Sequence, residues 1–600
     1  MGGEYTIRGT VTTPAGPAGG VVVEAVDADL GPDDSLATTT TDDDGRYELR
    51  IDPADAGGLL EGDPELYLRV SHGDRTSRVE VPAPSGRDVI EVDVELGPGG
   101  SGVETGRGVT DGAGTRSQIS PTSGGTTDRR PRHGMMEHRG MANVPRDPAH
   151  PGRGRFGRMF PNLAPAEHDA GFLQRVGLPG NVLEEQPDSP AGDADTVPAG
   201  FVFLGQFIDH DITLDPISSL SKQADPDALR NFRTARLDLD SLYGAGPEAQ
   251  PFLYRQDDPE KFLLGENDAG ERADLPRNGE GTALIGDMRN DENLVLSQLQ
   301  QAMLRFHNRV VDHLRETTGE EEVFEEAQQL VRWHYQWIVL HEYLPTVCQE
   351  PVVQDTLDDR ELFTVDTGEG AYMPVEFAGA VYRFGHSQAR FEYEINDEFG
   401  TGKLFGPPGD DDALSSGFEP VPSRKVVDWR HFFEFGGTEP QPAREIDPKL
   451  APDLLELPFI GAADHEPWER SLASRNLVRG RRLGLPSGPA VARRLGEEPL
   501  SNAESGFHEA LDAHGPAGEH EAPLWYYTLA EASETTGGET LGPVGSRVVA
   551  EVLAGLVDAD PRSFRTIQPN WTPTLPAPVS GGGTDYRMAD LLAFALDYEV

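Results

Sequence analysis

The chain has little cysteine, little lysine and no long apolar run. Cys348 is the only cysteine among 600 residues, so an internal disulfide is impossible. No stretch approaches the ~18 consecutive apolar residues of a membrane span. The start, Met1-Gly2-Gly3-Glu4-Tyr5, lacks both the basic region and the apolar segment of a signal peptide. We therefore expect a cytoplasmic protein with no membrane span.

Positive charge is also scarce, since 51 basic residues face 103 acidic ones and the formal net charge is -52. Nearly all cations are arginine; the lysines are Lys222, Lys261, Lys403, Lys425 and Lys449. Such a charge excludes nucleic acid or an anionic membrane as a partner bound by bulk electrostatics. A dense acidic surface stays hydrated when salt screens repulsion, so the composition indicates a halophilic source.

Six hundred residues exceed one hydrophobic core, so two or more domains are expected. Residues 1–97 predict an all-β sandwich, because short alternating or β-branched runs recur between turn residues. The runs are 5–11, 21–26, 47–51, 66–70, 78–81 and 89–94, and Asp44-Gly45 is a hairpin signal. The stretch 41–49 resembles the carboxypeptidase-regulatory-like, transthyretin-type sandwich. It carries no catalytic constellation, so an interaction or spacer module is the favoured interpretation.

Residues 98–130 are rich in Gly, Ser, Thr and Asp and predict a flexible linker. Residues 131–600 predict a large, mainly α-helical domain, giving a multidomain chain of a small β-sandwich followed by a helical unit. Apolar spacing predicts long helices over 291–315 and 324–344, the second closed by Pro345. Further helices are expected near 488–496, 546–557 and 588–597. Phe156, Met159, Phe160 and Leu163 are expected to anchor an irregular arm.

The stretch Gly205-Gln206-Phe207-Ile208-Asp209-His210-Asp211 places polar groups in an otherwise apolar helix. At 3.6 residues per turn, Gln206 and His210 share one face, whereas Asp211 lies on another. Burying such groups is costly unless each has a partner. The alternative is a polar helix end with a solvated histidine.

A second stretch runs from Thr234 to Gly244 and carries several hard oxygen ligands. In an extended chain Thr234, Arg236, Asp238 and Asp240 line one side. Carboxylates, a hydroxyl and backbone carbonyls suit Ca²⁺, and Asp211 would add a third carboxylate. The alternative is an amphipathic strand whose acidic residues face water.

Three later stretches carry further candidate groups. Residues 286–293 form a helix start, with Asp287 as N-cap and Arg289 and Glu292 on one face; a surface salt bridge is the alternative. His386, beside Phe384 and Gly385, is either a core histidine or an iron ligand. Residues 476–488 are basic and glycine-rich and indicate an anionic partner such as propionates, with solvated arginines as the alternative.

Taken in order, these five motifs resemble the animal-type haem peroxidases of the peroxidase–cyclooxygenase superfamily, microbial members included. The resemblance covers most of residues 131–600. It implies a mostly α-helical fold that holds haem b between helices, together with a calcium ion.

The resemblance implies a role for each matching residue. The catalytic residues would be the distal His210 with Gln206 beside it and the distal Arg289. The residues at the haem would be the proximal iron ligand His386, Asn476 bonded to its ring, Arg383 near a propionate, and Asp209 and Glu292, which can form ester links to haem methyl groups. The calcium ligands would be Asp211, Thr234, the carbonyl of Arg236, Asp238 and Asp240.

The implied function is a peroxidase that reduces hydrogen peroxide and, through a ferryl intermediate, oxidises small organic donors, iodide, bromide or thiocyanate, as in a response to oxidative stress. Two departures from the family pattern argue against chloride oxidation and against lipid oxidation. Asn293 replaces the haem-linked methionine of strong chloride oxidisers. Arg383 replaces the tyrosine of the lipid-oxidising members, and Tyr382 is one residue off. The alternatives are a fatty-acid dioxygenase, or a binding or adhesion protein with a degenerate scaffold.

Overall fold

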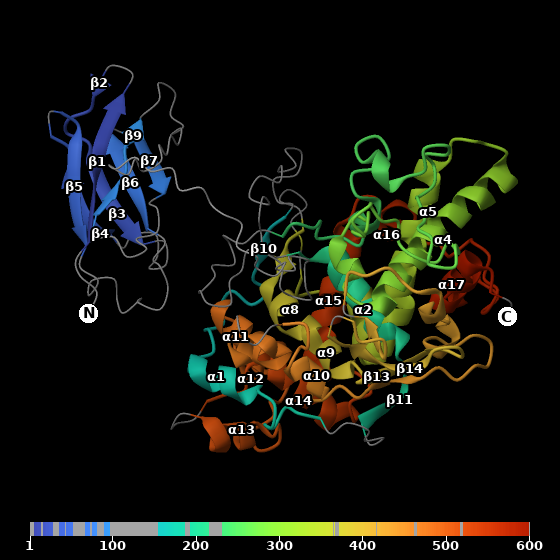
Figure 1. The fold of residues 1–600 in the computed structure, drawn as a ribbon. Coiled ribbons are helices and arrows are strands. Elements are labelled where there is room, and N and C mark those ends of the chain that lie inside the picture. The colour runs from blue at the N-terminus through green and yellow to red at the C-terminus, as the bar shows by residue number, and fades with distance from the viewer. Residues whose placement is uncertain are drawn as a thin grey trace. The chain divides into compact units, whose positions relative to one another are not determined.

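The computed structural model divides the chain into two compact units, Met1–Thr127 and Asp128–Val600. It describes residues 5–13, 16–27, 35–42, 44–51, 66–72, 75–80 and 89–95 of the first unit. In the second it describes 154–598, except 186–191, 215–230, 364, 366–370, 408, 416, 461–464 and 516–519. The predicted linker, 98–130, lies outside the described residues. The layout, with strands first and a large helical unit after them, is the multidomain one predicted (Figure 1).

The N-terminal unit contains two sheets that share one buried apolar cluster. In the first sheet, β1 (Tyr5–Thr13) pairs antiparallel with β2 (Gly16–Pro17) and β5 (Arg46–Ile51), and parallel with β8 (Val89–Glu91) and β9 (Val94–Glu95). The second sheet has the order β4 (Ser35–Thr40), β3 (Val22–Asp27), β6 (Leu66–His72) and β7 (Arg75–Glu80). Alternate apolar residues of both sheets, such as Ile7 and Val23, point into the shared cluster.

Two details of this unit differ from the sequence prediction. Strand β4 was missed, because Ser-Leu-Ala-Thr-Thr-Thr has only one large apolar residue, Leu36. Asp44-Gly45 does form a turn: Gly45 has φ +77°, and the Asp42 carboxylate accepts the amides of Asp44 and Arg46. The hairpin interpretation is wrong, however, since β4 pairs with β3 and β5 pairs with β1. The turn therefore connects the two sheets.

The second unit is built mainly of helices around one large apolar cluster. Its principal helices are α1 (Ala170–Val176), α2 (Gly200–Ile212), α4 (Leu294–Thr318), α5 (Phe324–Ile338), α7 (Glu350–Asp358), α11 (Leu472–Arg482), α12 (Gly488–Leu495), α13 (Phe507–His514), α14 (Leu524–Thr536), α15 (Pro543–Ala559) and α17 (Met588–Leu596). The shorter helices are α3 (Asp240–Tyr243), α6 (Leu344–Val347), α8 (Val375–Gly379), α9 (Gly385–Gln388), α10 (Pro452–Leu455) and α16 (Phe564–Ile567).

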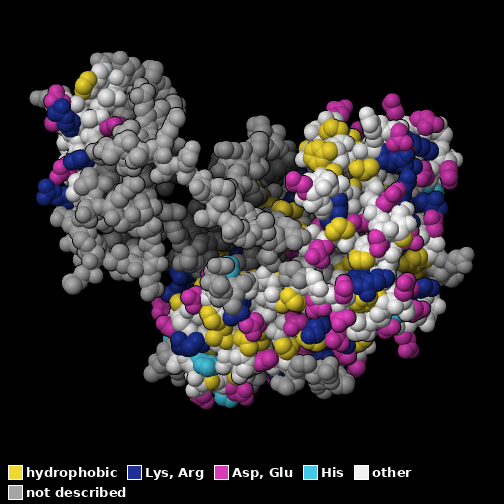
Figure 2. All heavy atoms as spheres, in the orientation of Figure 1, with side chains coloured by type: hydrophobic (Ala, Val, Ile, Leu, Met, Phe, Trp, Pro, Cys, Tyr) yellow, Lys and Arg dark blue, Asp and Glu magenta, His cyan; other side chains and the backbone are white. Residues whose placement is uncertain are grey.

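Short sheets complete this unit. They are β10 (Phe156–Gly157) with β12 (Met373–Pro374), β11 (Asp193–Pro198) with β16 (Pro442–Arg444), and β13 (Glu392–Asn396) with β14 (Gly400–Phe405) and β15 (Ala413–Ser415). In the described part of the chain, no helix combines the length and apolar character that a membrane crossing requires. Acidic side chains are spread over the face of this unit in Figure 2, with basic ones among them.

The two long central helices show where sequence periodicity succeeds and where it fails. Helix α4 begins at Leu294 rather than 291, because residues Met288–Asp291 form a 3₁₀ turn (η4) and the Asn293 side chain then caps the helix by accepting the Leu296 amide. The predicted helix 324–344 is present, but the turn Val339–Tyr343 is a π-helix.

An N-terminal arm of the second unit packs as expected. Phe156, Met159 and Phe160 are buried in its core. The carboxylate of Glu376 accepts the amides of Met159 and Phe160. Arg158, directly before Met159, donates to the carbonyls of Leu483 and Gly484, the latter 326 residues further along. The arm therefore joins the segment that follows α11.

Candidate functional site

Helix α2 carries the first candidate stretch, and its burial follows from its sequence. Phe201, Phe203, Leu204, Phe207 and Ile208 all lie in the core. The helix ends at Ile212, and Thr213 caps it by donating its hydroxyl to the carbonyl and side chain of Asp209. His210 and Asp211 are buried as well. Each must therefore find a partner, as the sequence predicts.

His210 is a buried, neutral base candidate. Its Nδ1 lies 2.8 Å from Oδ1 of Asn290, and its Nε2 lies 3.4 Å from Oε1 of Glu292. Burial lowers the pKa of His210 below its usual range, and the nearby charge of Arg289 lowers it further. The carboxylate of Glu292 opposes both effects. The solvated-histidine alternative is wrong for this residue.

Glu292 joins this histidine to Gln206. The amide of Gln206 donates to Oε1 of Glu292 at 2.6 Å, and the amide of Asn293 donates to Oε1 of Gln206 at 3.1 Å. Glu292 is only 3% exposed, so the surface salt-bridge alternative is wrong for it. Gln206, His210 and Glu292 thus form one connected polar group beside α2.

Arg289 faces the end of α2. Its Nη2 donates to the carbonyls of His210 and Thr213 and to Asp287, whose N-cap role is as predicted. Burial alone raises the pKa of Asp287, but Arg289 and Arg233 together bring it well below its usual range. Arg289 therefore ties η4 to α2 while holding a positive charge close to His210.

Asp211 points to a different environment, where three carboxylates meet. Oxygens of Asp211, Asp238 and Asp240 all lie within 4.8 Å of one another. Asp211 also accepts the Leu239 amide and the Ser241 hydroxyl. Burial raises the pKa of Asp211, and the other two carboxylates raise it further. Two buried acids and the half-buried Asp240 repel one another strongly at this spacing unless a cation or protons offset their charge.

The predicted extended chain over 234–240 is wrong. These residues form a series of bends, and Leu239 takes a left-handed conformation (φ 60°, ψ 36°) just before α3. Those bends turn Asp238 and Asp240 toward Asp211, which a strand would not do. The Thr234 hydroxyl donates to Asp238 at 2.7 Å, and the Arg236 side chain lies 3.6 Å from Asp560.

His386 lies on α9, directly after the 3₁₀ turn Val381–Phe384 (η6). Its Nδ1 is 2.9 Å from Nδ2 of Asn476 on α11. The predicted pairing is therefore present, but the amide presents its nitrogen where an acceptor oxygen was expected. Half a turn of the Asn476 amide would exchange its nitrogen and oxygen at the same distance. Helix α9 also contacts α2, which brings the two histidine-bearing segments together.

Two arginines lie near this pair. Arg383 donates through Nε to the carbonyl of Ala378. Arg475, next to Asn476 in sequence, is 4% exposed, and burial together with the charge of Arg383 lowers its pKa to about 10. Arg383 is half-buried, and the carboxylates of Glu469 and Glu292 offset part of the charge at Arg475.

Sequence reasoning missed Asn290, Gln300 and Arg475. Asn290 and Gln300 are fully buried and hydrogen-bonded to each other at 2.8 Å. The available signal was position: Asn290 follows Arg289, and Arg475 precedes Asn476. Polar residues directly beside candidate groups on a buried turn share their environment.

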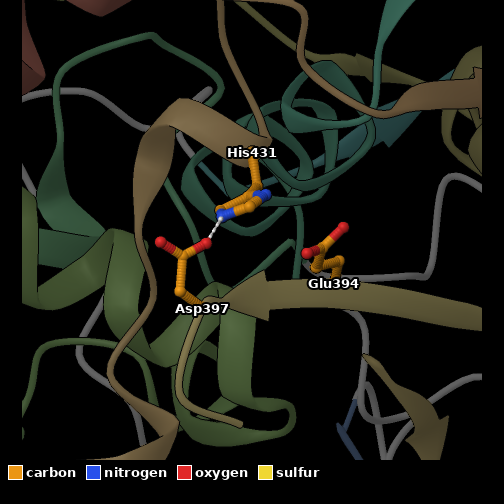
Figure 3. Close-up of side chains that lie close together, drawn as sticks. All are labelled: Glu394, Asp397 and His431. Atoms are coloured by element: carbon orange, nitrogen blue, oxygen red, sulfur yellow. Dashed lines mark ion pairs between the residues drawn. The ribbon is translucent and has the colours of Figure 1, made fainter. Parts of the chain in front are cut away.

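A second group of metal-ligating side chains lies outside this site. Glu394 on β13, Asp397 in the following turn and His431 at the end of the 3₁₀ turn Trp429–His431 have ligand atoms within 4.8 Å of one another (Figure 3). His431 Nε2 is 3.8 Å from Asp397, whose side chain is 98% exposed. It shares no residue with the groups described above.

Comparison with known proteins relates this part of the chain to a family. Residues 220–511 match the sequence model of the animal haem peroxidases. This region of the chain, residues 220–511, belongs to the animal haem peroxidase family. Arg289, His386 and Asn476 lie inside the matched range, whereas α2 with His210 precedes it. Membership of this family implies haem binding.

Curated relatives are similar to this chain at low sequence identity. Chorion peroxidase of Drosophila melanogaster is 25% identical over 307 residues, which cover 50% of this chain and 34% of that protein. Peroxinectin A of Dictyostelium discoideum is 28% identical over 232 residues, covering 36% of this chain and 38% of that protein. The chain thus spans little more than a third of each of these two relatives. The solved peroxidase A of D. discoideum shares 18% identity and a TM-score of 0.49, over 73% of this chain and 94% of that one.

Proposed function

We propose that the second unit is a haem-dependent peroxidase that reduces hydrogen peroxide and oxidises small organic donors, iodide, bromide or thiocyanate. The observation that carries the proposal is the arrangement of two histidines on contacting helices. His210 is buried and neutral on α2, and His386 on α9 is held at Nδ1 by Asn476. One suits a base, and the other suits an iron ligand whose second nitrogen is fixed.

The residues present fit a haem group. With Nδ1 of His386 held by Asn476, Nε2 is the nitrogen that would ligate iron. Arg383 and the buried Arg475 would bind the two propionates, which would offset the mutual repulsion of these cations. When bound, haem supplies the redox chemistry, namely two-electron reduction of peroxide followed by oxidation of the donor.

His210 would move the proton in this reaction. Its Nε2, close to Glu292, would take a proton from one oxygen of hydrogen peroxide and return it to the other, which leaves as water. Gln206, bonded to Glu292, would fix that carboxylate relative to the ring. Because burial keeps His210 neutral, it remains able to accept a proton at physiological pH.

Arg289 would act mainly through its charge. Its guanidinium is held by Asp287 and by two carbonyls at the end of α2, so its position is fixed before substrate arrives. A fixed positive charge beside the base lowers the pKa of His210 and favours negative charge on the departing oxygen. Preorganised groups of this kind contribute about 10²–10³ in rate.

A calcium ion is the cation that best fits Asp211, Asp238 and Asp240. The set is oxygen-only, with the Thr234 hydroxyl and the Arg236 carbonyl as further ligands, and Ca²⁺ prefers six to eight such oxygens. Because Asp211 follows His210 directly, the ion would hold the base-bearing turn of α2 in place. The predicted ester links of Asp209 and Glu292 to haem stay a prediction, and mass spectrometry of the haem-bearing peptides tests them.

A stopped-flow absorption experiment on the haem-loaded chain, in high salt with a slight excess of hydrogen peroxide, tests the function. We expect a fast shift of the haem band that iodide or a phenol reverses. His386→Ala should lose tightly held haem, whereas Arg289→Ala should keep haem and react with peroxide about 10²-fold more slowly. A haem band that ignores peroxide would point to a binding role for the scaffold.

One observation favours a second candidate, a fatty-acid dioxygenase. Tyr382 and Tyr343 are buried, and their hydroxyls are 3.1 Å apart. Tyr382 also stacks on Phe377, with ring centroids 4.4 Å apart. A buried, hydrogen-bonded tyrosine pair is suited to one-electron oxidation. Oxygen uptake with a polyunsaturated fatty acid and no peroxide, abolished in Tyr382→Phe, would establish this activity; its absence would leave the peroxidase proposal alone.

A further inference from the structure

Asn290 stands between His210 and the core, and nothing in the chemistry described so far assigns it a role. Its Oδ1 lies 2.8 Å from Nδ1 of His210, and its Nδ2 donates to Oε1 of Gln300 at 2.8 Å. Asn290 and Gln300 are both 0% exposed. The three side chains therefore form a buried row from the base into the start of α4.

The direction of this row decides which ring nitrogen of His210 carries the proton. The structure places the amide nitrogen of Asn290 against Gln300 and its amide oxygen against the ring. A carbonyl oxygen only accepts, so Nδ1 must donate to it. His210 is neutral and has one ring proton, and Nε2 is consequently the nitrogen with the lone pair.

A competing arrangement exists on the other side of the ring. Nε2 lies 3.4 Å from Oε1 of Glu292, which would accept a proton carried there. That oxygen already receives the Gln206 amide at 2.6 Å, so its competition is weakened. The 2.8 Å contact to Asn290 has hydrogen-bond length, whereas 3.4 Å exceeds it.

We propose that Asn290, oriented by Gln300, is a positioning residue that holds His210 in the Nδ1–H tautomer and so keeps Nε2 available as the base. The catalytic part of this inference rests on the proposed peroxidase function, but the tautomer does not. Without Asn290 the ring proton moves to Nε2 and donates to Glu292. The base is then blocked although every catalytic side chain is still present.

The matched variants are Asn290→Leu, which removes the acceptor at similar size, and Asn290→Asp, which keeps it. Gln300 can pair with either an amide or a carboxylate at position 290, because its Nε2 is buried with no hydrogen-bond partner among the described residues. Rotating the Gln300 amide would let Nε2 donate to the new carboxylate. Gln300→Met is the third variant; it removes the acceptor that orients Asn290.

The tautomer is read by ¹⁵N NMR of the full chain labelled at histidine and loaded with haem in its diamagnetic, carbonyl-bound reduced state. The His210 signals are assigned by their loss in His210→Gln. We expect a protonated Nδ1 and an unprotonated Nε2 in the wild type and in Asn290→Asp, the reverse in Asn290→Leu, and a mixture in Gln300→Met. A wild type with its proton on Nε2, or an Asn290→Leu variant that keeps it on Nδ1, would overturn the proposal.

Stopped-flow rates with hydrogen peroxide connect the tautomer to catalysis. Asn290→Leu should react about 10²-fold more slowly, the lower end of a general base's contribution, and Asn290→Asp should recover most of that loss. If the wild type shows the expected tautomer but does not react with peroxide, the peroxidase function fails while the positioning role of Asn290 stands. If Asn290→Leu does not fold, the wild-type, Asn290→Asp and Gln300→Met spectra still decide the tautomer.

Discussion

The two groups of metal-ligating side chains in the second unit differ in burial more than in composition. Asp211 and Asp238 are buried and Asp240 is half-buried, whereas Glu394 and Asp397 are exposed. Water stabilises the exposed charges at little cost. The enclosed charges lack that water, so the fold must supply a partner for them. Similar ligand chemistry therefore leaves one group in need of a cation or protons and the other as ordinary surface.

Removing calcium should change the free energy of unfolding more than the other treatments. It should act only through the cluster of Asp211, Asp238 and Asp240. Excess EGTA should lower the free energy of unfolding of the second unit by about 3 kcal/mol, the linkage expected when Ca²⁺ is present at ~100 times its Kd. All six tryptophans lie beyond residue 330, so tryptophan fluorescence in a denaturant titration reports on this unit alone. Asp211→Asn should be equally unstable and no longer respond to EGTA. If EGTA does not change the free energy of unfolding of the wild type, the chain has no calcium site of this kind.

Acid should have the next largest effect, through a buried group that lies outside both clusters. Burial lowers the pKa of His334 to about 4, and its ring is held by Leu330 and by the amides of Thr574 and Leu575. The unfolded chain protonates this histidine below about 6.5 and the folded chain does not, so stability is full above 6.5 and falls as pH drops toward 4. The loss is up to about 3 kcal/mol.

Unfolding titrations from pH 7 to 4 measure this loss. His334→Gln should show a flatter pH dependence than the wild type, although it starts less stable. His431→Gln, the matched change in the exposed cluster, should keep the wild-type slope. Equal slopes in His334→Gln and the wild type would show that other groups cause the acid sensitivity.

Asp240→Asn should have a smaller effect whose sign depends on calcium. Burial raises the pKa of Asp240 to about 7, with Asp238 adding to the rise and Arg233 opposing it. Without calcium at pH 8, the neutral amide removes repulsion and should stabilise the unit by about 1 kcal/mol. With calcium the same change removes a ligand and should destabilise it. If Asp240→Asn changes stability in the same direction with and without calcium, the three carboxylates do not share a cation.

Changes in the exposed cluster should have the smallest effect. Glu394→Gln and His431→Ala should alter the free energy of unfolding by less than about 0.5 kcal/mol, with or without EGTA, because both side chains keep access to water. The denaturant titration used for Asp211 measures this directly. A larger, EGTA-dependent loss would mean that burial does not distinguish the two groups.

Much of this site was predictable from residue order, because the polar residues lie at helix ends and in short motifs. The pattern 205–211 predicted a buried helix with partnered polar groups, and α2 is one. The approach of Asp238 and Asp240 to Asp211 was predicted for the wrong reason. It depends on the left-handed Leu239, which no periodicity signals, since apolar residues seldom adopt that conformation.

The partners of the candidate residues were less predictable than the residues themselves. Asn290 and Gln300 meet across ten positions because η4 is a 3₁₀ turn, and a continuous helix from 291 would have placed them differently. Arg475 is an exception to the rule that arginines lie mostly at the surface, and only packing shows its burial. Sequence patterns give the groups that do chemistry more readily than the groups that orient them.

The contact between Arg158 and Gly484 has a consequence for how the protein is made. The two residues are 326 positions apart, and synthesis at about 5–20 residues per second separates them by roughly 15–65 s. During part of that interval α2 with His210 has left the ribosome, whereas Asn476 has not yet been synthesised. Helix α2 can pack on α4 once residue 318 has been made, but the pairing of His386 with Asn476 must wait for α11. A site that needs both of these residues therefore forms only when most of the chain has been synthesised.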